Sequence, residues 1–391
     1  MESENQSHED IISRGVAECI HTESLKKKLS SQKTLRIKLG IDPTSPNIHL
    51  GRVIPLLKMR DFQKLGHTAV FIVGDFTGVI GDTSDKESER PMLTEETIKQ
   101  NMDSYVKQVS KIIDMDNAEV HYNSTWLKKL NFNDVGELAN HFSVADFIAR
   151  DNIRRRLDVG KRVSLREVLY PLMQGYDSVA VHADVELGGV DQRFNLLAGR
   201  VLQEKAGLPV QDIIMTELIP GTDGRKMSSS WGNTINMLDT PHDMYGKIMS
   251  IPDMLLEQYF TLITRLLAST IQEALQGHPK DAKMILARTI VSLFSGDKEA
   301  QEAEDSFKHT FEKSEFPTDT LVVSVAAGTN LVSVLLEEGF VDSKSEYRRL
   351  VEGNAIMNMQ SKQRITDFDF ILKEPLRLRI GKHRFIEIKI K

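Results

Sequence analysis

Short strand-like runs alternate with stretches of helical periodicity along the first part of the chain. Residues 35–39 form a short strand-like run, residues 69–73 form a continuous apolar run, and the segment between them places apolar side chains on one helical face. A strand, a helix and a second strand in this order predict a βαβ unit in a parallel sheet. Ahead of this unit, the apolar positions within residues 1–30 predict an amphipathic helix. We therefore expect an α/β domain over residues 1–235.

Helical periodicity dominates the remaining part of that domain and the segment that follows it. The pattern predicts helices over residues 94–115, 135–157 and 164–185, a strand over residues 119–122, and several helices over residues 241–311. Nearer the C-terminus, it predicts helices over residues 331–338 and 343–353 and strands over residues 355–359 and 376–391. We expect an α-helical domain with a linker over residues 236–320 and a small α+β domain over residues 321–391.

The first predicted strand leads through a loop into the first predicted helix of the βαβ unit. Turn-forming residues occupy the loop, including Gly40 and Asp42, and Thr44 follows them. His49 and Gly51 lie where the helix begins. A helix N-terminus presents free amide groups and a positive dipole end, so it suits an anionic ligand. A lone histidine at such a position is more often an ordinary surface residue, so this motif needs support from the rest of the chain.

A glycine-containing loop follows the second predicted strand. Gly74, Gly78 and Gly81 lie within eight residues, and Asp82 comes next. Open α/β sheets bind their ligands at the carboxyl ends of the strands, where this loop is expected. Asp82 is suited to an ammonium or a ribose hydroxyl, and further charged residues follow at Lys86 and Arg90. An ordinary surface loop explains the same residues equally well.

Three polar side chains share one face of the helix predicted over residues 164–185. Tyr170 and Gln174 are four residues apart, and Gln174 and Asp177 are three apart. Their neighbours are mostly apolar, so this face is expected to be buried, and buried polar groups need partners. A small polar ligand would satisfy them, and so would an internal hydrogen-bond network.

Two later segments combine glycine with polar side chains. Gly188-Gly189-Val190-Asp191-Gln192 follows a short predicted strand and begins a helix, either as a ligand site or as an ordinary helix start. Residues 221–233 form a polar loop that contains Arg225, Lys226 and several hydroxyl groups. Such a loop is suited to closing over phosphates, although a linker has the same composition.

Composition narrows the class of protein. Hydrophobic residues make up 40% and charged residues 27%, as in soluble globular proteins, and no apolar run approaches the roughly 20 residues of a membrane span. The acidic N-terminus is unlike a secretory signal, and Cys19 is the only cysteine, which fits a reducing cytoplasm. The net charge is −6, but residues 341–391 carry +5 and the rest −11. The negative net charge argues against indiscriminate nucleic-acid binding, whereas the basic tail suggests a local anionic partner, with RNA the first candidate, or it is simply a solvated charged face.

Taken together, the motifs resemble those of bacterial-type tyrosyl-tRNA synthetases, which are class I synthetases. His49-Leu50-Gly51-Arg52 is similar to the family's His-Ile-Gly-His signature, and Lys226-Met227-Ser228-Ser229-Ser230 is similar to its Lys-Met-Ser-Lys-Ser loop. The motifs around Asp82, Tyr170 and Asp191 also match in order and spacing. The last sixty or so residues look like an S4-type RNA-binding module. The resemblance covers nearly the whole chain after about residue 30 and implies a Rossmann-like catalytic domain, an α-helical tRNA-contacting domain and an S4-like domain.

The resemblance implies a role for each matching residue. The catalytic set is His49, Arg52, Lys86, Arg90, Lys226, Ser228 and Ser230. The tyrosine-binding set is Asp82, Tyr170, Gln174, Asp177, Gln192, Lys38 and Gly40. The ATP-binding set is Asp42, Thr44, His49, Gly51, Gly189, Asp191, Lys226 and Met227. Within these sets, Asp177 is expected to accept a hydrogen bond from the phenol hydroxyl of tyrosine.

The family reaction implied by the resemblance is activation of tyrosine with ATP, followed by transfer to tRNA. Catalysis would rest on positioning and charge stabilisation, with Mg²⁺ held mainly by the substrate and no tightly bound protein metal. The implied partners are tRNA, tyrosine and ATP, without DNA or membrane, in a cytoplasmic homodimer whose interface includes residues 142–148. The alternatives are a tryptophanyl-tRNA synthetase and a synthetase-like RNA-binding protein that does not activate an amino acid.

Three positions depart from the family pattern. Arg52 replaces the second histidine of the signature, and Ser229 replaces the second lysine of the loop. Lys38 stands where some family members carry a tyrosine that contacts the substrate hydroxyl. An arginine beside ATP would supply some of the charge missing from the loop, or it would simply point to solvent or pair with a carboxylate.

Overall fold

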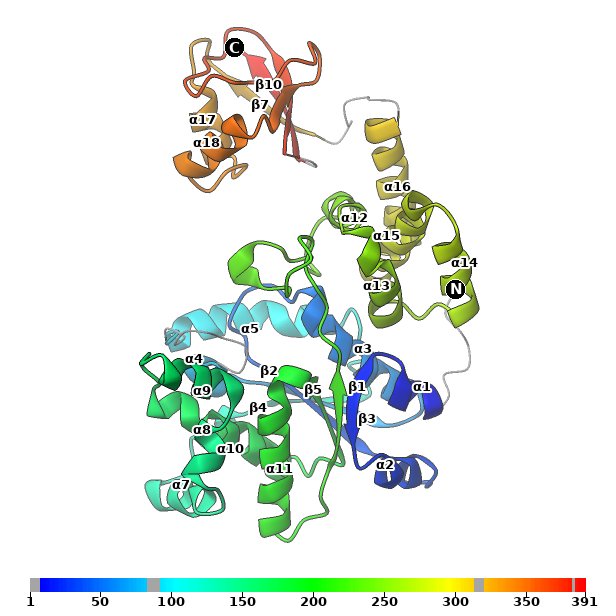
Figure 1. The fold of residues 1–391 in the computed structure, drawn as a ribbon, viewed down its shortest axis with the longest axis vertical. Helices are drawn as coiled ribbons and strands as arrows, with labels where there is room; N and C mark the ends of the chain where they lie inside the picture. Colours follow the sequence, from blue (N-terminus) through cyan, green and yellow to red (C-terminus); the bar gives the residue numbers. More distant parts are fainter. Residues whose placement is uncertain (1–7, 83–91, 313–319, 382–383) are drawn as a thin grey trace. The chain divides into compact units, whose positions relative to one another are not determined.

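The computed structural model describes residues 8–82, 92–312, 320–381 and 384–391 (Figure 1). It divides into two compact units, residues 1–239 with 251–286 and residues 240–250 with 287–391. Within the described residues, no helix is both long enough and apolar enough to cross a membrane.

A six-stranded sheet forms the centre of the first unit, in the order β1-β6-β5-β2-β3-β4. The strands are β1 (Val16–Ile20), β2 (Arg36–Ile41), β3 (Thr68–Val73), β4 (Ala118–Tyr122), β5 (Val185–Gly189) and β6 (Asp212–Thr216). Strands β2 to β6 pair in parallel, while β1 pairs antiparallel with β6 at the edge. The predicted α/β fold with a parallel sheet is confirmed, and the chain reverses its strand order between β2 and β5.

Helices cover this sheet, with α3 (Leu50–Lys64) following β2 and α10 (Leu165–Ala180) and α11 (Arg193–Lys205) flanking β5 in the sequence (Figure 1). The other helices assigned wholly to this unit are α1 (His8–Ser13), α2 (Thr22–Leu29), α4 (Thr77–Ile80), α5 (Glu95–Val109), α6 (Ser124–Leu127), α7 (Phe132–Ala139), α8 (Val144–Ile148), α9 (Asp151–Asp158), α13 (Leu256–Ile263) and α14 (Ala268–Gln276). Short 3₁₀ turns lie at η1 (Val190–Gln192), η2 (Ser229–Trp231) and η3 (Asp253–Leu255).

Three helix predictions in this unit were wrong in extent, and the one over residues 164–185 ends at Ala180 before β5 begins at Val185. The helix expected over residues 135–157 is interrupted, because Ser143 caps the N-terminus of α8 with its side chain and so starts a new helix after α7. The helix expected over residues 94–115 ends at Val109. Its Thr94 side chain accepts a hydrogen bond from the Thr97 amide, as the predicted start requires.

The single helix expected over residues 1–30 is also wrong where the structure describes it. Gly15 has a φ of +64° between α1 and β1, a conformation that suits glycine and ends the helix. The next five residues, Val16–Ile20, pair with β6 instead of continuing the helix. Apolar periodicity over so short a segment is ambiguous, and a strand from elsewhere in the sequence decides its conformation.

Lys58 on α3 fixes the end of α1. Its ammonium donates to the backbone oxygens of Asp10, Ile11 and Arg14 at 3.1, 3.0 and 2.7 Å. The side chain is buried, and burial lowers the pKa of Lys58 to about 8. These carbonyls lie at the C-terminal end of α1, where a cation also interacts favourably with the helix dipole.

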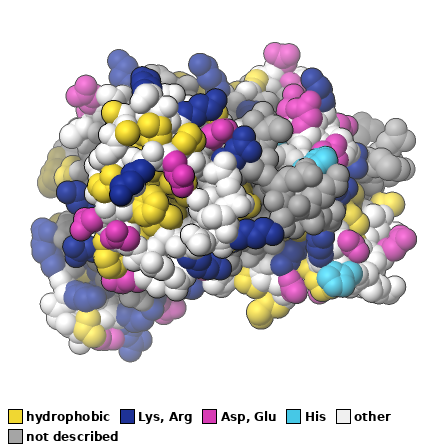
Figure 2. Space-filling view, turned by 90° about the horizontal axis from the view of Figure 1, so that it is seen from above, with side chains coloured by type: hydrophobic (Ala, Val, Ile, Leu, Met, Phe, Trp, Pro, Cys, Tyr) yellow, Lys and Arg dark blue, Asp and Glu magenta, His cyan; other side chains and the backbone are white. Residues whose placement is uncertain are grey.

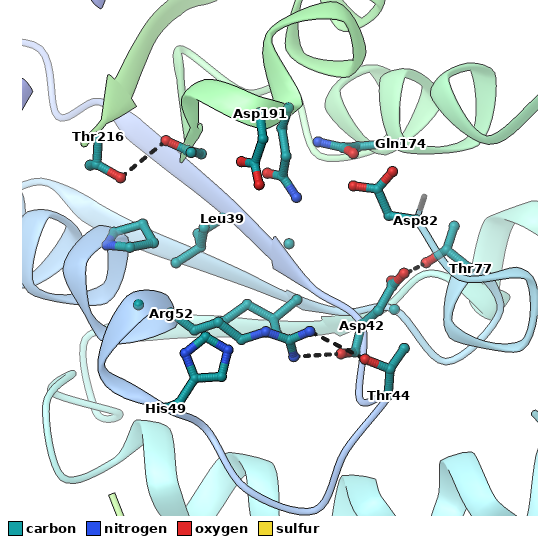
Figure 3. Close-up of a pocket in the computed structure, with 18 of the residues that line it drawn as sticks. Leu39, Asp42, Thr44, His49, Arg52, Thr77, Asp82, Gln174, Asp191 and Thr216 are labelled. Carbon is teal, nitrogen blue, oxygen red and sulfur yellow. Dashed lines mark hydrogen bonds between the residues drawn. The ribbon is translucent and has the colours of Figure 1, made fainter. Parts of the chain in front are cut away.

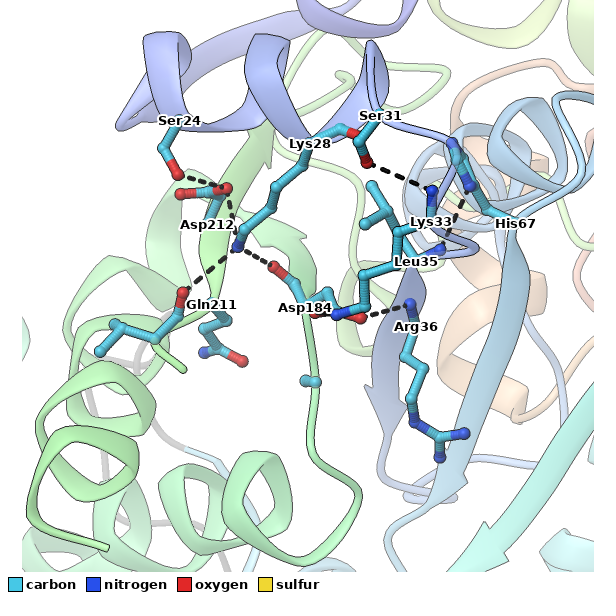
Figure 4. A network of polar contacts seen from close by, with 12 residues as sticks. Ser24, Lys28, Ser31, Lys33, Leu35, Arg36, His67, Asp184, Gln211 and Asp212 are labelled. Carbon is cyan, nitrogen blue, oxygen red and sulfur yellow. Dashed lines mark hydrogen bonds and ion pairs between the residues drawn. The ribbon is translucent and has the colours of Figure 1, made fainter. Parts of the chain in front are cut away.

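A polar network joins the amino ends of the parallel strands (Figure 4). Lys28 donates to the backbone oxygen of Asp184 at 2.9 Å and forms an ion pair with Asp212 at 2.9 Å. Lys33 pairs with the Asp184 carboxylate at 2.6 Å, and the same carboxylate accepts from the Arg36 amide at 3.0 Å. These contacts hold α2 against the ends of β2, β5 and β6 opposite to the carboxyl edge of the sheet.

The second unit contains α12 (Pro241–Met249), α16 (Asp297–Glu312) and a four-stranded sheet, while α15 (Pro279–Ser295) runs from the first unit into the second. The sheet has the order β7-β10-β9-β8, from β7 (Leu321–Val325), β8 (Ile356–Asn358), β9 (Leu376–Ile380) and β10 (Arg384–Ile390). With α17 (Leu331–Glu337) and α18 (Lys344–Glu352), the sheet shares a hydrophobic core. The small α+β domain is thus present, although β7 was not predicted as a strand.

Basic side chains in the C-terminal part of this unit are largely exposed. Lys344, Arg348 and Arg349 are exposed on α18, and Lys362 and Arg364 are exposed in the loop after β8. Over the face that Figure 2 presents, Lys and Arg side chains are interspersed with Asp and Glu. The named basic side chains of this part of the chain are therefore accessible to a ligand.

Candidate functional site

A cavity of about 380 Å³ opens at the carboxyl ends of β2 and β5, where the strand order reverses. This is the position at which open α/β sheets bind ligands. In Figure 3, His49 and Arg52 lie on one side of the cavity, whereas Gln174, Asp191 and Asp82 lie on the other. Segments that are far apart in the sequence therefore meet at one site.

Most of the residues that the sequence analysis singled out line this cavity. They are Gly40, Asp42, Thr44, His49, Gly51, Arg52, Asp82, Tyr170, Gln174, Asp177, Gly189, Asp191, Gln192, Lys226, Met227 and Ser228. Lys86 and Arg90 lie outside the described residues. The backbone of Ser230 is part of η2, and its side chain lies outside the description.

Lys38 is placed differently from the prediction that it contacts the ligand. It is completely buried in β2 and does not line the cavity. Its ammonium lies within hydrogen-bond distance of Ser178 and Glu186. A strand residue faces either the cavity or the packed interior, and the sequence alone did not distinguish these two directions for Lys38.

The Asp42 carboxylate links its own loop to Thr77 of α4 and Tyr170 of α10. One carboxylate oxygen accepts from the Thr77 hydroxyl at 2.7 Å, and the other accepts from the Tyr170 hydroxyl at 2.8 Å. A Cβ on Gly74 would lie 2.0 Å from this carboxylate, so only glycine fits beside it. Burial raises the pKa of Tyr170 well above its usual value, with the nearby Asp42 charge adding to the effect. Tyr170 therefore remains a neutral hydrogen-bond donor.

The N-terminus of α3 faces the cavity through His49, Gly51 and Arg52. The Leu50 amide donates to the Ile235 oxygen at 2.9 Å, which fixes the start of the helix against a segment far along the chain. A fifteen-residue helix provides an appreciable dipole at this end, which favours a negatively charged group. The predicted anion-binding helix start is therefore at the cavity.

Arg52 braces the loop that precedes its own helix. Its guanidinium donates to the backbone oxygen of Asp42 and to the Tyr105 hydroxyl, each at 3.0 Å, and to the Thr44 hydroxyl at 3.2 Å. Figure 3 shows the contacts with Asp42 and Thr44. The guanidinium thus shapes the loop as well as contributing positive charge to the cavity wall.

A buried carboxylate lies at the other end of the cavity. Asp177 is 3% exposed, and it accepts from the Trp126 indole at 2.7 Å and from the Asn123 amide at 3.3 Å. Burial raises the pKa of Asp177 to about 7, against the opposing charge of Lys38 and these two hydrogen bonds. A carboxyl group with a pKa near 7 is partly ionised at neutral pH, and its ionised form is a strong hydrogen-bond acceptor.

Asn123 and Trp126 were not found by the sequence analysis. Asn123 follows β4 directly, so it lies at the same carboxyl edge of the sheet as the other loops. It also donates to the Thr77 hydroxyl at 2.8 Å and accepts from the Phe76 amide at 3.0 Å. The position of a polar residue just after a predicted strand was an available signal.

The loop that contains Lys226 contacts Asp191, one of the residues that the resemblance assigns to ATP binding. Lys226 forms an ion pair with Asp191 at 2.9 Å. Asn233 fixes the loop, since its side chain accepts from the Ser228 amide at 2.9 Å and donates to the Asp223 carboxylate at 2.8 Å. The segments around residues 189–192 and 226–229 are thereby brought together at the cavity.

The cavity lining contains both acidic and basic side chains. Asp82 and Asp177 are acidic members of the lining, while Arg52 and Lys226 add positive charge, with Lys226 paired to Asp191. An amino acid presents an ammonium group, and a nucleoside triphosphate presents several negative charges. The cavity can therefore hold both kinds of group at once. Within the described residues, no three His, Cys, Asp or Glu side chains form a metal-binding group.

Comparison with known proteins identifies the family. Residues 29–312 match the model of the class I tRNA synthetases of the W and Y type. A tyrosine–tRNA ligase of Carboxydothermus hydrogenoformans is 43% identical, with 97% of each chain covered. The chain belongs to the tyrosine–tRNA ligase family. A tyrosine–tRNA ligase of Thermotoga maritima is 42% identical over 97% of this chain and 96% of its own.

Solved structures of more distant proteins share the fold of this tyrosine–tRNA ligase family member. A truncated mitochondrial tyrosyl-tRNA synthetase of Coccidioides posadasii matches with a TM-score of 0.63 at 24% identity, covering 77% of this chain and 92% of its own. A tyrosyl-tRNA synthetase of Archaeoglobus fulgidus, solved with L-tyrosine, matches with a TM-score of 0.60 at 23% identity, covering 75% and 98%. The alternative of a tryptophanyl enzyme is not favoured, because these curated relatives are tyrosine ligases.

Proposed function

We propose that this protein activates L-tyrosine with ATP and transfers the tyrosyl group to the 3′-terminal adenosine of tRNA(Tyr). The tyrosine carboxylate attacks the α-phosphate of ATP, which forms tyrosyl-adenylate and releases pyrophosphate. A hydroxyl of the terminal ribose then attacks the tyrosyl carbonyl carbon, and AMP leaves. The family supports this reaction, and the observation that carries tyrosine as the substrate is the buried Asp177 at one end of the cavity.

The amino acid would be held by its ends. Asp177 would accept from the phenol hydroxyl, while Trp126 and Asn123 keep its carboxylate oriented. The ammonium would lie near Asp82 and Gln174, with the Tyr170 hydroxyl close by. Gln192 would lie near the carboxylate of the substrate. In support of open space for the ligand, a Cβ on Gly40 would meet nothing within 4 Å.

ATP would occupy the part of the cavity between α3 and the loop after β6. Gly189 and Asp191 are assigned to the ribose, and His49 with Thr44 to the phosphates. Lys226 must leave Asp191 to reach a phosphate, because its ammonium now lies 2.9 Å from that carboxylate. Met227 and Ser228 would move with it, and Lys86, Arg90 and Ser230 are assigned to the same step by resemblance.

Catalysis would consist mainly of positioning and charge stabilisation. Negative charge grows on the leaving pyrophosphate, and the cations and helix-end amides around it lower the energy of that state. ATP enters as its Mg²⁺ complex, with the ion held mainly by phosphate oxygens. No side chain needs to form a covalent intermediate.

The remaining parts of the proposal concern partners and organisation. The division into residues 1–235, 236–320 and 321–391 is retained as a functional division, in which the last segment binds tRNA. Exposed basic residues such as Arg348 and Arg349 support an RNA contact. We also place the protein in the cytoplasm as a homodimer, because its relatives serve translation and because Val144 and Ile148 expose apolar surface.

The experiment that tests the proposed function is pyrophosphate exchange into ATP, followed by charging of tRNA(Tyr). Tyrosine should drive the exchange, whereas tryptophan and phenylalanine should not. Absence of tyrosine-dependent exchange in a folded protein would reject activation and favour the synthetase-like RNA-binding alternative. Exchange driven by tryptophan would reject the assignment of tyrosine.

A further inference from the structure

Lys38 uses its whole hydrogen-bonding capacity beneath the wall of the cavity. Its ammonium donates to the backbone oxygen of Gln174 at 2.9 Å, to the Ser178 hydroxyl at 2.7 Å and to the Glu186 carboxylate at 2.7 Å. An ammonium has three donors, so all of them are satisfied. Lys38 and Glu186 are 0% and 1% exposed, so the pair is shielded from solvent screening.

The contacts of Lys38 hold one turn of α10 from inside. Gln174 and Ser178 are four residues apart on that helix, and Lys38 binds the carbonyl of the first and the hydroxyl of the second. The Ser178 hydroxyl also donates to Glu186 at 3.0 Å. Removal of the ammonium would leave the Glu186 carboxylate buried without its cation, which is strongly unfavourable.

The same network reaches the cavity through the side chain of Gln174. Its oxygen accepts from the Asn195 amide at 3.0 Å, and its nitrogen lies 3.4 Å from Glu186. Gln174 lines the cavity, whereas Glu186 lies behind it. The orientation of this cavity side chain is therefore set by groups that no ligand touches.

Asp177 lies between the two residues that Lys38 binds on α10. Two charged groups act on it from the sheet, since Lys38 of β2 lowers its pKa and Glu186 of β5 raises it. Donors act from the segment after β4, where Trp126 and Asn123 also lower its pKa. On its own helix, Tyr170 is the titratable neighbour, and it stays neutral.

We propose that Lys38 is a positioning residue for tyrosine recognition, whose buried ammonium, paired with Glu186, fixes the turn of α10 that carries Gln174 and Asp177 and provides the positive charge beneath it. The proposal rests on the proposed function. It assigns Lys38 to the support of the cavity wall in place of the direct contact expected from the sequence. Lys38 thereby favours the ionised form of Asp177 that accepts the phenol hydrogen.

The test compares pH profiles of kcat/KM for tyrosine in pyrophosphate exchange. Such a profile reports the pKa of essential groups in the free enzyme. Lys38→Met with Glu186→Gln removes both charges without leaving either one unpaired. Because Lys38 has the larger effect on Asp177, we expect the midpoint of the rise to move upward by about one pH unit, equivalent to about tenfold in the ionisation equilibrium. KM for ATP should change by less than about threefold.

Glu186→Gln alone provides a test of opposite sign. It keeps Lys38 and removes the charge that raises the pKa of Asp177, so the midpoint should move downward. The matched control is Lys58→Met, which also removes a buried lysine of the first unit but one that does not line or support the cavity. It should leave the midpoint at its original pH. Lys38→Arg should leave the midpoint close to its original pH, because it keeps the positive charge at this position.

Four results would overturn the proposal. The first two are an unchanged midpoint of the kcat/KM profile in the folded double variant and an upward shift of the midpoint in Glu186→Gln. The third is a midpoint shift in Lys58→Met equal to that of the double variant. The fourth is an equal loss of kcat/KM for tyrosine and for ATP in the double variant. If the double variant fails to fold, the sign of the Glu186→Gln shift decides. Failure of the proposed function is distinguished by the unaltered protein, which would then show no tyrosine-dependent exchange at any pH.

Discussion

Asp177 is held in place by donors of its own chain while remaining at the cavity surface. Trp126 and Asn123 both donate to its carboxylate, so the group is oriented before a ligand arrives. A site built to bond a substrate hydroxyl can reject the analogue that lacks it by about 10⁴ to 10⁵, because polar groups are then left unpaired. Under the proposed function, the buried Asp177 carboxylate would be the group that distinguishes tyrosine from phenylalanine.

We expect Asp177→Ala to lose tyrosine activation by several powers of ten while any activation of phenylalanine changes little. Pyrophosphate exchange with each amino acid gives the ratio of kcat/KM values. Asp75→Ala provides a control, since Asp75 is a carboxylate of the same region that bonds to Ser124 and does not line the cavity. Retention of the original discrimination by Asp177→Ala would show that the phenol is bound elsewhere.

Arg52 is engaged by Asp42 and Thr44 of the loop before α3 and by Tyr105 of α5. These contacts favour a role of Arg52 in bracing this loop over a role in replacing the charge of the family lysine at the position of Ser229. We expect Arg52→His to slow tyrosyl-adenylate formation by about 10 to 100-fold, as the loss of roughly 1.5–3 kcal/mol of charged contacts predicts. Ser229→Lys should add its own effect independently.

A double-mutant cycle on pre-steady-state adenylate formation separates these two roles of Arg52. The four proteins are the unaltered chain, Arg52→His, Ser229→Lys and the double variant. Additive effects support bracing. Recovery of most of the lost rate by Ser229→Lys in the Arg52→His background would instead establish that the two substitutions compensate each other.

At the scale of elements, α1 depends on α3 through the buried Lys58. The unfolded chain holds the Lys58 proton with a pKa near 10.4, whereas the folded chain has a pKa of about 8. Between these values the unfolded state binds more protons, so the free energy of unfolding rises with pH. The buried Lys58 therefore lowers the free energy of unfolding most below about pH 8. This destabilisation disappears as the pH approaches the pKa of a free lysine.

We expect the free energy of unfolding of the unaltered protein, minus that of Lys58→Met, to increase by about 2 kcal/mol between about pH 8 and about pH 10. Urea unfolding at both pH values measures it, and the groups shared by the two proteins cancel in the difference. A difference that stays constant or falls would mean that the folded pKa of Lys58 is not lowered.

For the whole molecule, the C-terminal sheet with α17 and α18 has its own hydrophobic core. We expect removal of residues 320–391 to preserve tyrosine-dependent pyrophosphate exchange and to reduce tRNA charging by at least about tenfold, because several phosphate contacts would be lost. In the full chain, Arg348→Ala with Arg349→Ala should weaken tRNA binding and reduce its salt dependence. Lys26→Ala with Lys27→Ala, an exposed pair on α2, should have little effect on either. Equal loss of exchange and charging in a folded truncated protein would reject this separation of roles.

The proposed homodimer makes a prediction about mass and surface. Phe132, Val144 and Ile148 are 93%, 75% and 40% exposed in the helices after β4, an arrangement suited to a second copy. We expect light scattering at micromolar concentration to give twice the mass of the chain, and Val144→Glu to lower that mass. Leu267→Glu alters an exposed apolar residue outside this group and should leave the mass unchanged. A single-chain mass for the unaltered protein would contradict the dimer.

The sequence by itself determined the βαβ start, the parallel sheet and the order of the cavity motifs. These features depend on local information, because apolar periodicity distinguishes strand from helix and glycine marks the loops between them. The helix start at His49 and the shared face of Tyr170, Gln174 and Asp177 follow from the same local geometry. Since parallel strands end at one edge of a sheet, the sequence also placed their loops together.

Only the tertiary structure decided which groups these local elements meet. Val16–Ile20 became a strand because β6 pairs with it, and Lys38 faces the interior because Glu186 and Ser178 lie there. Asn123 completes the cavity for the same kind of reason, since its partner Asp177 is 54 residues away in the sequence. Hydrophobic periodicity indicates the conformation of long segments, but the conformation of short ones, burial and the pairing of polar groups depend on contacts between distant segments.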